Sequence, residues 1–291
     1  MDWLNAAVQG LLLGGLYALF AAGLSLVFGT MRLTNIAHGD LSMLAAYGAI
    51  LIVNGLRFNP FYAIPVTMAM MFIVGYCVQR GVINRIVLKG NVNAGIIVTF
   101  GISMVIQNAL LVAFSANPKG LDAGKVESAS IRIAERLAVG WLPVIIFGAA
   151  VVSLAGLQVF LWRTRLGRAV RAVSDNQEAA RVMGIDPKHV WAVAMGGALL
   201  LGAIGGVLMG IRTTFDPMLG IVHLLFAFEA VVIGGLGSVW GTLIGGMVLG
   251  LAQTLGAEAF GPSWSIVCGH VVFILLLIVR PQGLLPKAVT T

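Results

Sequence analysis

The sequence predicts an all-α polytopic membrane protein, and three observations support this fold class. Of the 291 residues, 59% are hydrophobic and 10% are charged, whereas soluble domains carry about 25% charged residues. The mean hydropathy is +0.99. Apolar runs of about 20 residues, long enough to cross ~30 Å of hydrocarbon as helices, recur along the chain, and the short alternating segments of a membrane β-barrel are absent. A water-soluble globular protein is excluded.

The apolar runs divide the chain into eight or nine spans within a single transmembrane domain, residues 1–291. The expected spans are 6–28, 37–54, 61–80, 94–114, 141–161, 191–211, 221–233, 239–258 and 264–280. The seventh is short, and the glycines of 234–237 separate it from the eighth. The 221–258 pair is therefore either two crossings or a broken helix that re-enters the membrane, a backbone that must be buried in protein or line a wet cavity.

Glycines recur at four-residue spacing in several of these spans. They are Gly10/Gly14, Gly202/Gly206/Gly210, Gly241/Gly245 and Gly246/Gly250. Small residues at this spacing let two helix backbones approach closely where no hydrophobic effect separates protein from lipid. The sequence therefore predicts close helix packing along these ridges.

The positive charges are distributed unevenly between the two sides of the predicted spans. Twelve of the 18 lysines and arginines fall on one side: Arg32, Arg80, Arg85, Lys89, Arg163, Arg165, Arg168, Arg171, Arg181, Lys188, Arg280 and Lys287. Positive charges accumulate in cytoplasmic loops, so this side is predicted to be cytoplasmic. The N-terminus is then periplasmic and the C-terminus cytoplasmic, which needs an odd number of crossings. The net charge of +7 is thus a topological signal, and we expect no nucleic-acid partner.

The loop 115–140 is the sizeable segment expected on the outer side. Its charges are mixed in sign, with lysines and arginines accompanied by Asp122, Glu127 and Glu135. It could form a lid or a docking rim, but the sequence favours a plain solvated connection.

The loop 163–190 contains a short helix with signals at both ends. Ser174 or Asp175 can cap its start, because a Gln or Glu follows three residues later in a capping-box arrangement. Gly184 can supply the left-handed stop, with the next residue folding back onto the helix as in a Schellman motif. Asp186 and Pro187 are then the N-cap and first residue of the following span.

One face of this short helix is apolar and small. It carries Ala179, Val182 and Met183 at helical spacing, with Glu178 and Arg181 beside them. A helix of two to three turns is marginal in water, so the face needs a surface to pack on. Helices that lie on lipid normally carry larger apolar residues and more Lys or Arg, so a groove on a soluble protein partner is favoured.

Three strings then resemble a known family. EAARVMG, residues 178–184, resembles the EAA-xxx-G core of the loop by which permeases of ATP-binding-cassette (ABC) importers contact their ATPases, although the downstream Ile-x-Leu-Pro is missing. LGRAVRAVSDNQEAARVMGI, FGTMRLTNIAHGDLSMLAAYGA and FEAVVIGGLGSVWGTLIGG resemble branched-chain amino acid permeases over nearly the whole chain. NIAHGD, residues 35–40, is typical of the H-type subunit rather than its M-type sister.

The resemblance implies a type II importer-like permease in the bacterial inner membrane. Its implied partners are two ABC ATPases, a sister permease or second copy of this chain, and a periplasmic substrate-binding protein. The cargo would be a branched-chain amino acid or a related small polar compound. ATP would be bound by the partners, and no cofactor is expected here. The implied ATPase-coupling residues are Asp175, Glu178, Ala179, Ala180, Val182, Met183 and Gly184.

Polar residues inside the spans are candidates for the translocation path or its gate, because ionisable groups at membrane depth are costly. The candidates are Asn35, His38, Asp40, Glu229, Gly234, Gly235 and Gly237. For Asn35 and Asp40 the alternative is helix capping, which we favour for Asn35. For the three glycines the alternative is tight packing. His223 and His270 are interpreted as isolated packing histidines.

The sequence contains no motif that predicts enzyme chemistry. HExxH, the Walker A motif and GxSxG are absent, and Cys77 and Cys268 lie inside apolar spans, as core cysteines do. We therefore expect no catalytic or metal site in this chain. The rival function is a secondary transporter driven by protons through Asp40 or Glu229, which leaves the short capped helix without a purpose.

Overall fold

The computed structural model describes residues 3–31, 33–56, 59–87, 92–134 and 137–285. It confirms the all-α membrane fold. Eight of the described helices are long and apolar enough to cross a membrane, and one more is shorter. The long helices are α1 (Trp3–Met31), α2 (His38–Leu56), α3 (Pro60–Val78), α5 (Val92–Phe114), α7 (Trp141–Arg163), α10 (Pro187–Arg212), α12 (Val239–Phe260) and α13 (Ser265–Val279), and the short one is α11 (Leu219–Gly234).

Smaller elements connect these spans. A π-helical turn, Gln79–Ile83, and α4 (Asn84–Val87) continue α3, whereas a 3-10 turn, Pro262–Trp264, precedes α13. The loop 163–190 holds α8 (Arg165–Asp175) and α9 (Gln177–Val182). The outer loop holds α6 (Lys125–Ser128) and the antiparallel strands β1 (Ser130–Ala134) and β2 (Leu137–Gly140).

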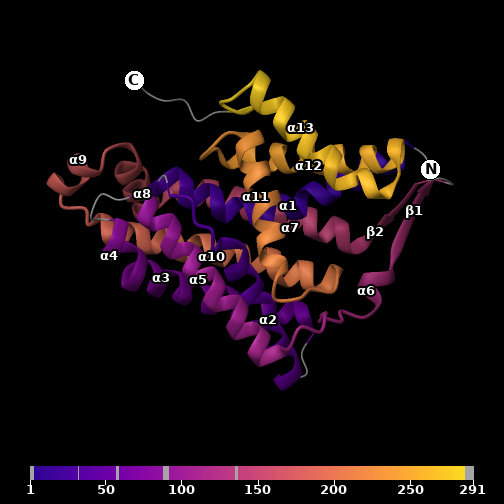
Figure 1. Ribbon diagram of the computed structural model, residues 1–291, viewed down its shortest axis with the longest axis horizontal. Coiled ribbons are helices and arrows are strands. Elements are labelled where there is room, and N and C mark those ends of the chain that lie inside the picture. Colours follow the sequence, from indigo (N-terminus) through magenta and orange to yellow (C-terminus); the bar gives the residue numbers. More distant parts are fainter. Residues whose placement is uncertain (1–2, 32, 57–58, 88–91, 135–136, 286–291) are drawn as a thin grey trace.

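The connecting elements lie at two opposite ends of the molecule (Figure 1). We call the end with α4, α8 and α9 the α9 end, and the end with α6, β1 and β2 the hairpin end. At the α9 end, the Ser174 hydroxyl donates a hydrogen bond to the Gly29 carbonyl at the end of α1. Gly237 lies against the same Gly29. Leu284 N–H donates to the Ile233 carbonyl at 2.8 Å, which brings the C-terminal segment to this end.

The start of α1 and the outer loop share the hairpin end. Gln9 Nε2 donates to the Ala138 carbonyl at 3.0 Å, and Lys119 N–H donates to the Phe215 carbonyl at 2.8 Å. The described residues show the predicted separation of the two sets of loops, and Arg32, Arg57, Lys89, Arg136 and Lys287 lie outside the described residues. The outer loop is hydrogen-bonded to α1 and to the segment after α10, and most of its described residues are exposed, so its role as a plain connection stays a prediction.

The question of whether 221–258 crosses twice is answered by the ends of α11. Its 16 residues span roughly 24 Å, less than the ~30 Å of a hydrocarbon core, and the helix is steeply inclined to its neighbours (Figure 1). The preceding loop starts at the hairpin end with Phe215, and the following turn lies at the α9 end with Gly237. The loop and α11 together therefore run from the hairpin end to the α9 end, and α12 returns, so the segment makes two passes through the bundle.

Glycines make the closest helix contacts, as their spacing predicts. Gly10 and Gly14 on α1 lie against the backbone of Gly250 and Gly246 on α12, where an added Cβ would collide with a carbonyl. Gly245 lies in the same way against the Ala230 carbonyl of α11. The ridges of α1 and α12 therefore form one face-to-face contact, and α1 is the core of the bundle.

Candidate coupling helix and buried polar cluster

The helix α9 begins later than the sequence predicts. Its N-cap is Asn176, whose side-chain oxygen accepts a hydrogen bond from Ala179 N–H at 3.0 Å. Ser174 and Asp175, the predicted caps, instead belong to α8. Because α8 continues to Asp175, Ser174 lies inside that helix, and its hydroxyl donates to the Gly29 carbonyl of α1. The N-cap of α9 is therefore one residue later than the later of the two predicted caps.

The end of α9 follows the prediction closely. Gly184 has a φ of 80°, the left-handed conformation that favours glycine. Ile185 N–H donates to the Ala180 carbonyl at 3.0 Å, which is the long hydrogen bond of a Schellman motif. Asp186 then caps α10 by accepting from Lys188 N–H at 3.0 Å, with Pro187 as first helical residue. Caps at both ends therefore hold this six-residue helix.

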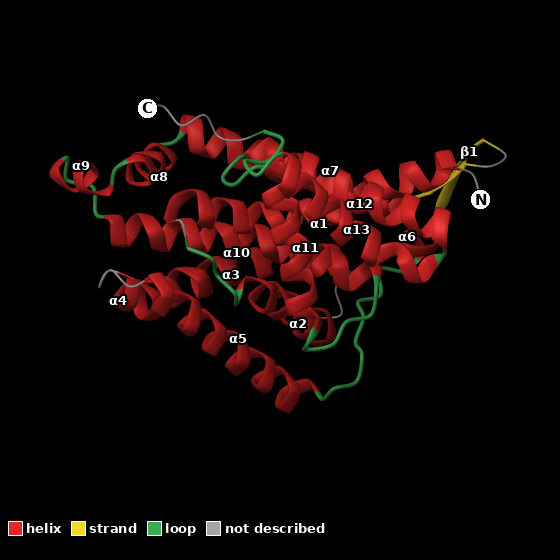
Figure 2. Ribbon diagram, turned by 45° about the horizontal axis from the view of Figure 1, so that its top comes forward, coloured by secondary structure: helices red, strands yellow, loops and turns green. Residues whose placement is uncertain are grey.

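The predicted apolar face of α9 is open. Val182 is 87% exposed and Met183 is 80% exposed, and Ala179 and Glu178 are exposed as well. Ala180 faces inward and is buried. Figure 2 shows α9 projecting from the bundle at its far end, beyond α8. Val182 and Met183 therefore form an exposed apolar pair on a helix that is capped at both ends.

The segment before α9 also differs from the prediction. Of the arginines interpreted as mainly topological, Arg163 ends α7, whereas Arg165, Arg168 and Arg171 lie on α8. This helix was not predicted; it is amphipathic and buries Gly167, Val170 and Val173. Thr164 caps this helix by accepting from Gly167 N–H at 2.9 Å. Figures 1 and 2 show α8 directly beside α9.

A second group of candidates lies in a break between α1 and α2. Residues 33–37 are not helical, yet Leu33, Asn35 and Ala37 are buried. The Asn35 side-chain oxygen accepts from Ala37 N–H at 3.1 Å, and its backbone carbonyl accepts from His38 N–H at 3.2 Å. Asn35 therefore closes the turn that starts α2, as the capping alternative predicts.

His38 reaches back to α1 and is fully buried. Its Nε2 lies 3.1 Å from the Phe20 carbonyl, and its ring edge lies beside Gly23. Phe20 is near the middle of α1, so α2 begins deep within the bundle rather than at its surface. The non-helical backbone at depth is therefore the segment 33–37.

Asp40 does not cap its helix. Its two carboxylate oxygens accept hydrogen bonds from α5: Ser103 Oγ donates at 2.5 Å and Gln107 Nε2 donates at 3.1 Å. Thr99, one turn earlier on α5, accepts from Ile36 N–H at 3.2 Å. The sequence analysis missed Thr99, Ser103 and Gln107, although their i, i+4, i+8 spacing in an apolar span indicates one polar helix face.

Glu229 and His270 form a pair, so the interpretation of His270 as isolated is wrong. Glu229 Oε1 lies 2.5 Å from His270 Nδ1, and the Phe226 ring stacks on the imidazole. Glu229 is buried, whereas the His270 side chain is 33% exposed. The other Glu229 oxygen has no hydrogen-bond partner among the residues that the structure describes. His223, in contrast, bonds its own helix through the Leu219 carbonyl at 2.9 Å.

The predicted glycine break, 234–237, is a tight turn at the α9 end. Gly235 and Gly237 have φ values of 105° and 79°, and Gly234 lies against the backbone of Gly241. Leu285 N–H donates to the Gly234 carbonyl at 3.0 Å. Protein groups thus occupy this turn closely, which is what the tight-packing alternative predicts.

The chain resembles known transport proteins over most of its length. Residues 6–279 match the family described as branched-chain amino acid transport system / permease component. The high-affinity branched-chain amino acid transport system permease protein BraD of Pseudomonas aeruginosa is 29% identical over 98% of this chain and 96% of its own length. LivH of Escherichia coli, with the same description, is 28% identical over 98% and 96%.

A relative with a different described cargo is also similar. The ribose import permease protein RbsC of Escherichia coli is 30% identical over 90% of this chain and 81% of its own length. The family match, the multi-span helical fold and the three sequence strings agree. This chain belongs to the branched-chain amino acid transport permease family and is the membrane-spanning permease subunit of an ABC importer.

Proposed function

We propose that this permease imports a branched-chain amino acid or a related small polar compound. We further propose that α9 couples translocation of this cargo to ATP hydrolysis on separate ATPase subunits. The observation that carries the coupling proposal is the exposed apolar face of α9, with Val182 87% and Met183 80% exposed on a helix fixed by caps at both ends. The cargo proposal rests on the described substrates of BraD and LivH.

The coupling residues divide into two groups by their placement. Glu178, Ala179, Val182 and Met183 form the exposed surface that a cleft in an ATPase would cover. Ala180 and Gly184 shape the helix, since the first is buried and the second ends it. Asp175 ends α8 and orients the connection to α9. The α9 end is then cytoplasmic, with the N-terminus periplasmic and the C-terminus cytoplasmic.

The proposed path for the cargo follows the break before α2. Asn35, His38 and Asp40 bring polar groups to the interior of the bundle, where most other side chains are apolar. A sister permease or second copy would complete the path, and a periplasmic binding protein would deliver the cargo. Glu229 contributes a buried polar contact, and the turn Gly234–Gly237 lies at the cytoplasmic mouth under this orientation.

Met183→Glu tests the coupling proposal most directly. The side chain is 80% exposed, so the change leaves the fold intact, but a charge in an apolar docking groove weakens binding by about tenfold or more. The measurement is co-purification of candidate ATPases and ATP-dependent uptake into vesicles. Lys125→Glu is the matched control, because Lys125 is an exposed residue at the hairpin end.

Gly184→Pro gives a second test of the same helix. Proline cannot adopt the φ of 80° that Gly184 has, so the Schellman end is lost and ATPase association falls, with little change in thermal stability. If both variants associate and transport normally, α9 is not the coupling element. Uptake that persists without an ATPase and collapses with an uncoupler would instead support the proton-driven alternative through Asp40 or Glu229.

A further inference from the structure

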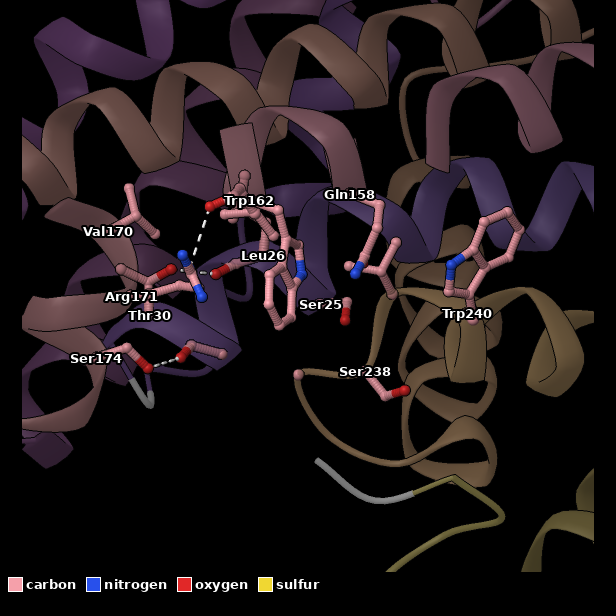
Figure 3. A pocket seen from close by; sticks show the side chains of 14 residues that line it. Ser25, Leu26, Thr30, Gln158, Trp162, Val170, Arg171, Ser174, Ser238 and Trp240 are labelled. Carbon is pink, nitrogen blue, oxygen red and sulfur yellow. Dashed lines mark hydrogen bonds between the residues drawn. The ribbon is translucent and has the colours of Figure 1, made fainter. Parts of the chain in front are cut away.

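A cavity of about 220 Å³ lies at the α9 end, between four helices. It is lined by α1, α7, α8 and the start of α12 (Figure 3). A water molecule takes about 30 Å³ of the liquid, so the space can hold a tetrahedral oxyanion together with its hydration. The cavity is separate from the exposed face of α9 and from the cluster around Asp40.

One polar group in this cavity is buried without a partner. Ser25 on α1 is 2% exposed and lines the cavity, and within the described part of the chain its hydroxyl has no hydrogen-bond partner. A buried hydroxyl that is left unpaired costs about 1–3 kcal/mol. The position therefore suits a ligand that offers a hydrogen-bond acceptor to Ser25.

The positively charged side chain of Arg171 also lines this cavity. Arg171 on α8 donates through Nε to the Leu161 carbonyl at 3.1 Å, and its guanidinium lies 4.5 Å from the centre of the Trp162 ring. These two contacts fix the side chain in place (Figure 3). The terminal guanidinium nitrogens have the geometry that binds phosphate oxygens.

The surroundings of the cavity are those of a membrane interface. Trp162 and Trp240, two of its lining residues, are 59% and 43% exposed, and tryptophans concentrate at the level of lipid headgroups. Val152 and Val159 are 72% and 58% exposed on the same face of α7 as Trp162, which gives an apolar track for an acyl chain. Basic pockets between helices on the cytoplasmic side bind acidic headgroups.

We propose that this cavity binds the phosphate group of an anionic phospholipid. Arg171 contacts the phosphate, Ser25 donates its hydroxyl to a phosphate oxygen, and the acyl chains lie along α7. The lipid would thereby join α8, the helix next to α9, to α1 and α12. The shared chemistry of the site is a phosphate oxyanion, and a free phosphate ester is the other source that the experiment distinguishes.

The test uses the purified full chain in detergent with added lipid. Phosphatidylglycerol, phosphatidylcholine or glycerol 3-phosphate is added, and native mass spectrometry measures the bound fraction while a thermal melt measures stability. We expect phosphatidylglycerol to be retained and to raise the melting temperature, whereas phosphatidylcholine does so much less. Equal effects of glycerol 3-phosphate and phosphatidylglycerol would keep the phosphate site and assign it to a soluble ligand.

Matched variants locate the binding. Arg171→Gln should lower phosphatidylglycerol retention about five- to tenfold, the effect of one interfacial arginine. Arg168→Gln is the control, because Arg168 is an exposed arginine on the same helix that does not line the cavity, and it should change retention by less than about twofold.

Ser25→Ala keeps the proposal testable if Arg171→Gln fails to fold. Its hydroxyl has no hydrogen-bond partner among the described residues, so the melting temperature measured without added lipid should stay the same or rise while retention falls about threefold. Arg171→Lys should retain more lipid than Arg171→Gln. Retention of phosphatidylglycerol by Arg171→Gln and Ser25→Ala at the level of Arg168→Gln would overturn the proposal.

Discussion

Asp40 and Glu229 are both acids buried among apolar helices, but their oxygens are satisfied differently. Both carboxylate oxygens of Asp40 accept hydrogen bonds from side chains of α5. Glu229 shares one oxygen with a half-buried histidine, and its other oxygen has no partner. The same signal in the sequence, an acid in an apolar run, thus marks a carboxylate with both oxygens hydrogen-bonded in one place and a carboxylate with one oxygen hydrogen-bonded in the other.

The difference matters because α5 depends on Asp40 and its neighbours. α5 packs mainly on α2, and Figure 2 shows it diverging from the rest of the bundle. Its polar face meets Asp40 and the backbone of Ile36, so a few buried hydrogen bonds attach this span. Glu229 is on α11 and bonds His270 on α13, and α12 packs against both of these helices, so this side of the bundle has many other contacts.

The comparison predicts the largest effect for Asp40→Leu. Ser103 and Gln107 would each lose a buried acceptor, which lowers the free energy of unfolding by about 3 kcal/mol. Unfolding by denaturant titration in mixed micelles measures this loss. Asp40→Asn is the matched control, because its amide can accept from Gln107 and donate to Ser103, and it should cost less than about 1 kcal/mol.

Gln107→Leu should have an intermediate effect. It removes one hydrogen bond to Asp40, at 3.1 Å, and should lower the free energy of unfolding by about 1–2 kcal/mol. Asn108→Leu is the adjacent control, since Asn108 is exposed and bonds the Met104 carbonyl of its own helix. Equal losses for the two variants would show that α5 is not attached through Asp40.

Glu229→Met should have the smallest effect, within about 1 kcal/mol of the wild type. The change removes one oxygen that has no partner among the described residues, and only a single hydrogen bond, to His270 Nδ1, is lost. The same titration measures it beside Asp40→Leu. A loss as large as that of Asp40→Leu would erase the distinction between the two acids.

Most spans could be predicted from the sequence because hydropathy and length determine them. The end of α9 was also predictable, since Gly184 and Asp186 with Pro187 act through local backbone geometry. The start of α9 was not, because α8 extends through Ser174 and Asp175 and leaves Asn176 as the N-cap, while the Ser174 hydroxyl bonds Gly29, 145 residues away in the chain. A helix end is predictable from neighbouring residues when its hydrogen bonds are all local, and less so when contacts distant in sequence are also made there.

The polar cluster was predictable only in part. The burial of Asp40 followed from its place in an apolar run, but its partners lie on α5, 63 and 67 residues later. The glycine turn at 235–237 was placed at membrane depth, whereas the depth break is 33–37. The partners of Asp40 and the position of this break depend on how α2 packs back against α1. The periodicity within a single helix does not contain that information.

The glycine contacts of α10 determine what kind of motion this helix can transmit. Gly196 lies against Phe72 of α3, Gly202 and Gly206 lie against Ser42 of α2, and Ala198 lies against Gly23 of α1. Interlocked on three sides, α10 cannot slide along its axis like a piston past static neighbours. We therefore expect a displacement of α10 to carry α1, α2 and α3 with it, together with α12, whose glycines pack against α1.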